Sequence, residues 1–157
     1  MQTGDGEDYR RIYGQVVDMI RQGAPEASCL LIGPLDQATR KRGQIVSKVG
    51  VDRLIRFQKM VAAERGCAYW DAREAMGGEG AFARWLRHKP RLASPDLMHI
   101  TKPGGQLLGD VLADLLMDAY DRWRAVNPDI GWAPEECDPD GVEDTGTSDT
   151  GLMASSG

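Results

Sequence analysis

The chain has 157 residues, of which 41% are hydrophobic and 27% are charged, which places it in the globular class with a single modest core. No uninterrupted apolar run reaches the roughly 18 residues of a membrane-spanning helix, so we expect no membrane span. Met1 is followed by Gln, Thr, Gly and Asp rather than by a basic and then apolar leader, so we expect no export signal within this sequence.

The net charge of -5 is distributed unevenly. Residues 128–157 contain eight Asp and Glu and no Lys or Arg, and this composition predicts a disordered acidic tail. The domain expected over residues 1–127 is therefore mildly basic, with clusters at Arg40–Arg42 and from Arg84 to Arg91. Because no aromatic residues are interleaved in a recognisable binding module, we expect a solvated surface and no nucleic-acid partner; an anionic polymer substrate stays open.

The first half of the chain alternates helices with strands. An amphipathic helix is predicted over residues 8–22, and the apolar run 28–32 predicts a central strand that is buried on both faces. A polar loop containing Arg40–Gly43 follows. A second helix is predicted over 51–65 and a second short strand over 67–70. This order is typical of parallel α/β architecture.

The second half is less regular until its last helix. We predict a glycine-rich loop at 76–80 and a short helix at 81–87. Trp85 belongs either to the core or to the wall of a substrate cleft. Apolar residues recur at helical spacing throughout 104–123, which predicts a long helix with Thr101 as its N-cap.

The three cysteines carry little information on function. Cys29 and Cys67 each lie in an apolar run and are interpreted as free, buried thiols, and Cys137 lies in the predicted tail. The chain has no Cys-x-x-Cys or Cys/His spacing, which argues against a zinc site, and three cysteines do not form a disulfide framework. We therefore expect no bound metal.

One pair of residues carries recognisable chemistry. Asp96 and His99 lie three residues apart on a turn that leads into the last helix, so the carboxylate can reach the imidazole ring. In a Ser-His-Asp mechanism the histidine accepts the proton of serine and returns it to the leaving group, while the carboxylate orients the ring. We predict these two roles for His99 and Asp96, although an isolated Asp-x-x-His is more often a solvated turn.

Three blocks give the chain a resemblance to a known family. The stretch SPDLMHITKPGGQLLGDVLADLLMDAY resembles the last conserved block of SGNH/GDSL-type ester hydrolases, in which Asp-x-x-His precedes the closing helix. CLLIGPLD and CAYWDAREAMGGEGAFARW are similar to the branch with peptidoglycan O-acetylesterase-like proteins. The resemblance covers residues 9–123.

The resemblance implies a fold, a substrate class and a location. It implies the C-terminal portion of a flavodoxin-like doubly wound parallel sheet, with three α/β/α layers and its N-terminal strands missing. Small-molecule or glycan esters, chiefly acetyl esters of carbohydrate or peptidoglycan, are the implied substrates. Acyl transfer through serine requires no cofactor, so none is implied. The resemblance also implies a periplasmic or secreted protein.

The chain departs from the family pattern at the nucleophile. The family's Gly-Asp-Ser, its oxyanion-hole glycine and its Gly-x-Asn block precede the helix with which this chain begins, and none of them is found. Ser94 follows no strand and is too close to Asp96 to serve instead. We therefore expect a fragment that is inactive alone. The alternative is a non-catalytic α/β remnant whose exposed sheet edge pairs with itself or with a partner chain.

Overall fold

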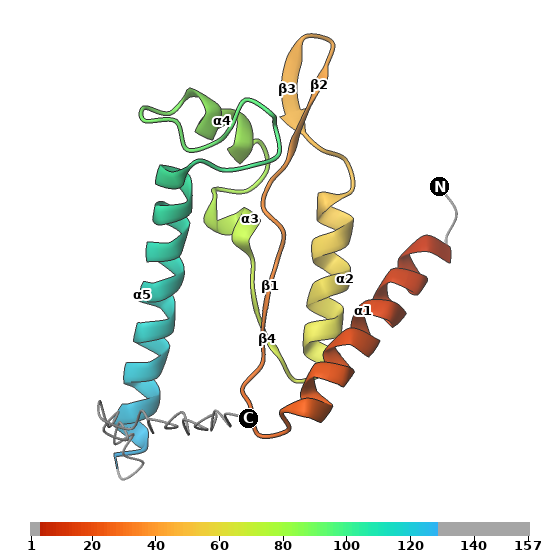
Figure 1. Ribbon diagram of the computed structural model, residues 1–157, viewed down its shortest axis with the longest axis vertical. Coiled ribbons are helices and arrows are strands. Elements are labelled where there is room, and N and C mark those ends of the chain that lie inside the picture. Colours follow the sequence, from red (N-terminus) through yellow and green to blue (C-terminus); the bar gives the residue numbers. More distant parts are fainter. Residues whose placement is uncertain (1–3, 129–157) are drawn as a thin grey trace, which may run out of the picture. The chain divides into compact units, whose positions relative to one another are not determined.

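A computed structural model describes residues 4–128 of the chain (Figure 1). The chain divides into two units, Met1–Ala119 and Tyr120–Gly157. The helices α1–α4 and all four strands belong to the first unit, and the described part of the second is the end of the last helix. The acidic tail predicted over 128–157 lies outside the described residues from residue 129 onward.

Two amphipathic helices form one layer of the first unit. α1 spans Gly4–Gly23 and α2 spans Val51–Glu64, and they confirm the two helices predicted from apolar periodicity. They contact each other through the tilted rings of Tyr9 and Phe57, and the side-chain amide of Gln58 donates to the Tyr9 hydroxyl at 3.0 Å. At the other end of this contact, Arg65 pairs with Asp18.

A two-stranded parallel sheet lies beside these helices. β1 spans Leu30–Ile32 and β4 spans Ala68–Trp70, with Leu30 opposite Ala68 and Ile32 opposite Trp70. The prediction that β1 is central and buried on both faces was wrong for the described residues. There β1 pairs with β4 alone, and the side chain of Ile32 is 52% exposed.

A disulfide joins Cys29 to Cys67, immediately before the two parallel strands. The interpretation of these residues as free thiols was therefore wrong. Parallel pairing brings the two Cα atoms to 4.7 Å, within the usual range for a disulfide, although the residues are 38 apart in sequence. An apolar run looks the same around a free thiol and around a disulfide, so only the strand register reveals the bond.

The polar segment after β1 is a hairpin rather than a loop. β2 spans Ala38–Lys41, β3 spans Gln44–Ser47, and the two strands pair antiparallel. Arg42 and Gly43 form its turn, with φ values of 50° and 79°. Positive φ at both central residues is typical of a type I′ hairpin turn, which usually begins with Asn, Asp or Gly. An arginine in that position concealed the hairpin from sequence analysis.

Three helices and a compact core complete the first unit. α3 spans Ala72–Ala75, α4 spans Ala81–Arg87 and α5 spans Lys102–Val126, so the predicted short and long helices are confirmed. The core gathers around α4 and the start of α5; its buried members are Ala38, Met76, Ala81, Phe82, Trp85, Leu92, Ala93 and Leu108. Trp85 is a core residue and not the wall of a cleft, because it is buried and its indole N–H donates to the Met76 carbonyl at 3.1 Å.

The first unit has α/β architecture, as predicted. Within the first unit, Figure 1 shows α1 and α2 on one side of the β1–β4 pair and the part of α5 up to Ala119 on the other side. Within residues 4–128, none of the helices combines the length and the apolar character that a membrane crossing requires.

Candidate active site

Three connecting segments meet at one edge of the parallel sheet. The β2–β3 hairpin follows β1, the segment with α3 and α4 follows β4, and a loop of residues 92–101 leads from α4 into α5. Figure 1 shows all three segments at the upper end of the strands. Parallel α/β sheets bind their ligands at the carboxyl ends of their strands, which makes this edge the place to search for a site.

The loop of residues 92–101 is closed by backbone hydrogen bonds across its base. Ala93 forms an antiparallel bridge with Ile100, and the Ser94 N–H donates to the His99 carbonyl at 2.8 Å. At its tip Leu97 has a φ of 65°, and its carbonyl accepts the Ala38 N–H at 3.0 Å. A non-glycine residue with positive φ is uncommon and needs support from its surroundings, which the start of β2 supplies here.

The structure brings Asp96 and His99 into direct contact. Oδ1 of Asp96 accepts the backbone N–H groups of Met98 and His99, each at 2.9 Å. Its Oδ2 lies 2.8 Å from Nδ1 of His99. The pKa of Asp96 lies well below its usual range because the carboxylate accepts three hydrogen bonds. In order of importance these come from the His99 backbone, the His99 ring and the Met98 backbone. Because an ionised carboxylate can only accept, Nδ1 carries the proton of the neutral ring.

This contact leaves the other ring nitrogen available. The His99 side chain is 74% exposed, and within residues 4–128 its ring forms no hydrogen bond other than that to Asp96. With a proton on Nδ1, the lone pair of Nε2 faces outward and can accept a proton. The geometry therefore suits a general base, and the catalytic role of the pair stays a prediction.

None of the serines in the described part of the chain hydrogen-bonds to the imidazole. Ser47 Oγ donates to Asp36 at 3.0 Å and accepts the Gly80 N–H at 2.7 Å, so it is already committed. Ser94 contacts His99 through its backbone only. Ser28 lies at the other end of β1, in the wall of a separate pocket. Within residues 4–128, His99 therefore has no serine hydroxyl bonded to its ring.

Sequence analysis missed one buried carboxylate, that of Asp36, which connects the segments at this edge of the sheet. Asp36 is fully buried and accepts hydrogen bonds from Ser47 Oγ, from Arg73 Nε at 3.2 Å and from the Phe82 N–H at 3.0 Å. Arg73 also pairs with Asp52. Asp36 therefore ties the hairpin, α3 and the start of α4 together, two residues before the Ala38 N–H that holds Leu97. Its position just after an apolar strand was the signal that could have identified it.

The start of α5 fixes the other end of the loop. The Thr101 hydroxyl accepts the Gly104 N–H at 3.4 Å, as expected for the predicted N-cap, and donates to the Arg91 carbonyl at 2.6 Å. A Cβ atom at Gly104 would lie only 2.0 Å from the carbonyl oxygen of Leu92. The first turn of α5 thus packs directly on the backbone of the loop that carries Asp96 and His99.

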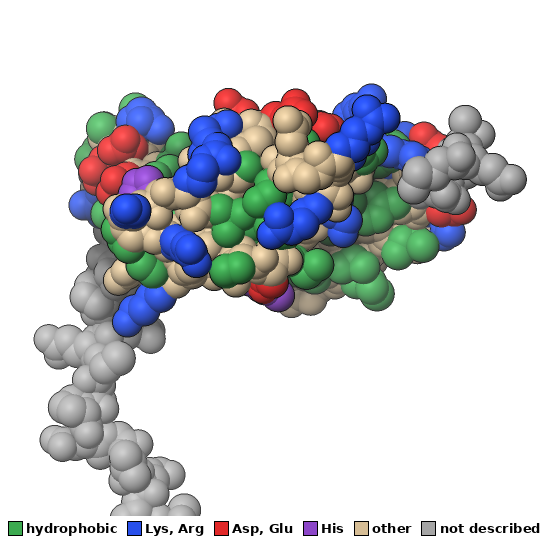
Figure 2. Space-filling view, turned by 90° about the horizontal axis from the view of Figure 1, so that it is seen from above, with side chains coloured by type: hydrophobic (Ala, Val, Ile, Leu, Met, Phe, Trp, Pro, Cys, Tyr) green, Lys and Arg blue, Asp and Glu red, His purple; other side chains and the backbone are tan. Residues whose placement is uncertain are grey.

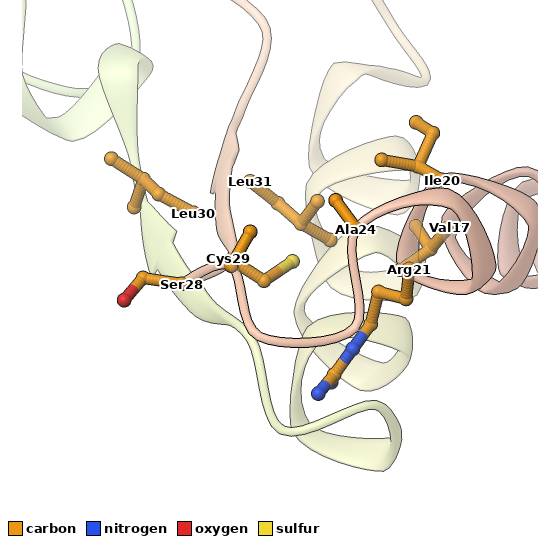
Figure 3. A pocket seen from close by; sticks show the side chains of 9 residues that line it. Val17, Ile20, Arg21, Ala24, Ser28, Cys29, Leu30 and Leu31 are labelled. Carbon is orange, nitrogen blue, oxygen red and sulfur yellow. The ribbon is translucent and has the colours of Figure 1, made fainter.

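A separate apolar pocket of about 190 Å³ lies at the opposite, amino end of β1 (Figure 3). Figure 3 shows Val17, Ile20 and Ala24 of the α1 side facing Leu31 and Cys29. Arg21 is the sole charged residue among those lining it, and no carboxylate or histidine takes part. This pocket offers no acid or base and is not the candidate active site.

Comparison with known proteins places this geometry in context. No family model matches the chain, and no curated protein matches it. A solved structure titled "Peptidoglycan O-acetylesterase in action, 5 min" aligns with 24% identity and a TM-score of 0.67, over 75% of this chain and 33% of that chain. The esterase domain of the ORF1 protein from the zebrafish ZfL2-1 retrotransposon aligns with 20% identity and a TM-score of 0.48, over 75% of this chain and 61% of the other.

The chain spans about a third of the length of the O-acetylesterase structure. At this identity the likeness concerns the fold alone, and it agrees with the resemblance to peptidoglycan O-acetylesterase-like proteins that the sequence blocks indicated. It does not test the roles of Asp96 and His99.

Proposed function

We propose that this chain supplies the acid/base half of the active site of a carboxylic ester hydrolase of the SGNH type. His99 acts as general base and general acid, and Asp96 orients its ring and stabilises the imidazolium that forms. The observation that carries the proposal is the 2.8 Å contact between Asp96 Oδ2 and His99 Nδ1, in which the carboxylate is held by two backbone N–H groups. The fold likeness to an O-acetylesterase supports the same reaction class.

The chemistry follows from the free Nε2. A serine hydroxyl from outside residues 4–128 loses its proton to Nε2 while its oxygen attacks the ester carbonyl carbon. Nε2 then returns the proton to the alkoxide as the bond between the acyl carbon and the leaving oxygen breaks. Water deacylates the serine by the same two transfers, and the Asp96 carboxylate stabilises the imidazolium in each. Acetyl esters of carbohydrate or peptidoglycan are the proposed substrates.

The proposal extends to the fold and the location. The order α1, β1, α2, β4, α5, with helices on both sides of a parallel pair, supports the C-terminal portion of a flavodoxin-like, three-layer sheet. The disulfide between Cys29 and Cys67 supports a periplasmic or secreted protein, since disulfides persist in oxidising compartments.

The test is hydrolysis of a chromogenic acetyl ester by the full chain, alone and mixed with a polypeptide that carries the Gly-Asp-Ser block. The chain covers a third of the O-acetylesterase structure, so the remainder of that protein is the polypeptide to test as the source of this block. We expect turnover in the mixture and a loss of about 10²–10⁴-fold in His99→Ala, because general acid/base catalysis contributes that much.

His88→Ala is the matched control. His88 is also an exposed histidine, and its Nδ1 lies 2.8 Å from the Pro90 carbonyl oxygen rather than near a carboxylate. Its loss should leave the rate unchanged. Turnover that survives in His99→Ala, or a mixture that forms a complex without His99-dependent turnover, would contradict the hydrolase proposal.

The open edge of β1 favours a second candidate function, pairing with a strand of a second copy of this chain. The Ala68 N–H donates to the Cys29 carbonyl, and the Gly33 N–H donates to the Trp70 carbonyl, each at 2.8 Å. Because successive residues of a strand alternate in direction, the N–H and C=O groups of Leu30 and Ile32 point to the other edge. Residues 27–35 carry no charge, so two such edges can pair without like charges meeting.

A further inference from the structure

The edge of the sheet that carries Asp96 and His99 is rich in cations. The two connecting segments 33–50 and 71–102 together contain ten Lys and Arg and five Asp and Glu. Of those five acids, Asp36 is buried against Arg73, and Asp96 is bonded to His99. Figure 2 looks down onto this end and shows several separate groups of Lys and Arg side chains. The two segments around the candidate site therefore carry a net positive charge.

The tip of the β2–β3 hairpin holds the densest group. Arg40, Lys41 and Arg42 are consecutive and exposed, and no carboxylate of the described residues lies within 4.0 Å of their charged groups. Two cations on the helix layer differ in this respect: Arg10 pairs with Glu64, and Arg65 pairs with Asp18. The hairpin tip is thus a surface whose charge is not neutralised within residues 4–128.

The hairpin is fixed relative to the Asp96–His99 pair. At its first strand the Ala38 N–H holds the Leu97 carbonyl, inside the turn that carries the pair. At its last residue Ser47 bonds to Asp36 and to the Gly80 N–H. Arg42 lies four residues beyond Ala38, which at about 3.3 Å per strand residue places it roughly 13 Å along the hairpin. A ligand that contacts both the turn of Leu97 and the tip of the hairpin therefore has to be extended, as a polymer is.

We propose that the β2–β3 hairpin binds the chain of an anionic polysaccharide, whose ester groups are then presented to His99. Carboxylate groups along the polysaccharide pair with Arg40, Lys41 and Arg42, and the planar guanidinium groups offer two parallel N–H donors to each carboxylate. The identification as a substrate rests on the proposed hydrolase function, while the binding itself does not.

The hairpin surface suits a nucleic acid less well than an anionic polysaccharide. Proteins that bind single strands stack the bases on aromatic side chains. Neither the hairpin, residues 38–47, nor the segment 87–102 contains Trp, Tyr or Phe, and the nearby Phe82 and Trp85 are buried in the core. The surface thus provides positive charge without a stacking platform.

The test is fluorescence anisotropy with the full chain and three labelled probes: a polygalacturonate oligosaccharide, a dextran of equal length and a single-stranded RNA of equal charge. The hairpin variant is Arg40→Gln, Lys41→Gln and Arg42→Asn, because Asn is favoured at the first central position of a type I′ turn and preserves the hairpin. The control variant, Arg11→Gln, Arg53→Gln and Arg56→Gln, removes three cations from α1 and α2.

We expect the polygalacturonate to bind more tightly than dextran, with an affinity that falls as salt rises. The hairpin variant should bind it roughly tenfold more weakly, since three partly screened ion pairs are lost, and the control variant should bind like the original chain. Equal binding of polygalacturonate and dextran, or an unchanged affinity in the hairpin variant, would overturn the proposal. Tighter binding of the RNA would overturn it in favour of a nucleic-acid surface.

His99→Ala separates this proposal from the hydrolase proposal. The variant should bind polygalacturonate like the original chain, because the imidazole is not part of the cationic surface. If the hairpin variant binds weakly while hydrolysis is independent of His99, the anion site stands and the hydrolase function fails. If His99 is required for hydrolysis but the hairpin variant binds normally, the hydrolase stands and the anion site fails.

Discussion

Asp96 accepts hydrogen bonds from the backbone of its turn and from the His99 ring at the same time. Its Oδ1 holds two backbone N–H groups, and its Oδ2 holds the His99 imidazole. The carboxylate is therefore a structural element of the loop as well as the candidate orienting group. Protonation of this carboxylate should therefore weaken its hydrogen bonds to the backbone and to the ring together.

The folded chain should lose stability in acid through Asp96. Its pKa is lower in the folded chain than its ordinary value of 3.8, so the ionised carboxylate stabilises the fold above that pH. This contribution should be lost as the pH falls below about 4. Asp96→Asn keeps an oxygen acceptor for the backbone and removes the charge. The difference in unfolding free energy between the two proteins, from urea titrations at pH 7, 5 and 3, should be largest at pH 7. A difference that is constant over this range would contradict the hydrogen bonds described.

Asp36 has a structural role beside the candidate site. Its carboxylate is fully buried yet paired with Arg73 and satisfied by two further donors. A buried charge is tolerated only with such partners. Through Ser47 and the backbone at Ala38, it keeps the hairpin against the turn that carries Asp96 and His99.

The long helix α5 depends on one close approach for its placement. Gly104 packs on the Leu92 carbonyl, whereas Gly109, on the same helix, has open space around the position of a Cβ atom. Replacement of Gly104 by alanine and replacement of Gly109 by alanine should therefore have opposite effects on the stability of the fold.

Gly104→Ala should destabilise the fold by about 1–3 kcal/mol, since the helix has to move away from the loop. Gly109→Ala should stabilise it by about 0.5–1 kcal/mol, since alanine favours an exposed helix interior over glycine. Urea denaturation of both variants measures these changes. In the hydrolysis assay Gly104→Ala should also lower the rate, whereas Gly109→Ala should not. Similar stabilities for the two variants would contradict the close packing.

The first unit as a whole leaves apolar surface exposed. Ile12, Val16, Met19 and Ile20 of α1 are each at least 40% exposed, and so is Ile32 on the open strand. The part of α5 within the unit adds Leu107, Val111, Leu115 and Leu116. Exposed apolar side chains on α1, α5 and β1, together with the unpaired edge of β1, favour association.

We predict that the chain self-associates through β1 and that Ile32→Lys weakens the association, because it places a charge on the open edge. Sedimentation equilibrium measures the effect as a shift from dimer toward monomer. Val49→Lys is the control: Val49 is 94% exposed in the segment before α2, so the same charge is added away from the strand. A monomer at all concentrations, or equal dissociation in both variants, would contradict pairing through this edge.

The sequence alone predicted the order of α1, β1, α2, β4, α4 and α5, the α/β class and the proximity of Asp96 to His99. These depend on local properties: the apolar period of α1, α2 and α5, the uncharged runs of β1 and β4, and a spacing of three residues on a turn. Each can be recognised without knowing what the element packs against.

Only the tertiary structure decided the Cys29–Cys67 bond, the hairpin, the burial of Trp85 and the central place of Asp36. Strand register brings two distant cysteines together, and a type I′ turn formed around Arg42 places three cations on one rigid projection. In the sequence Asp36 cannot be distinguished from an exposed loop carboxylate, because its partners Arg73, Ser47 and Phe82 are distant along the chain. These features depend on contacts between residues far apart in the chain, and the free energy of such contacts is not encoded in local periodicity.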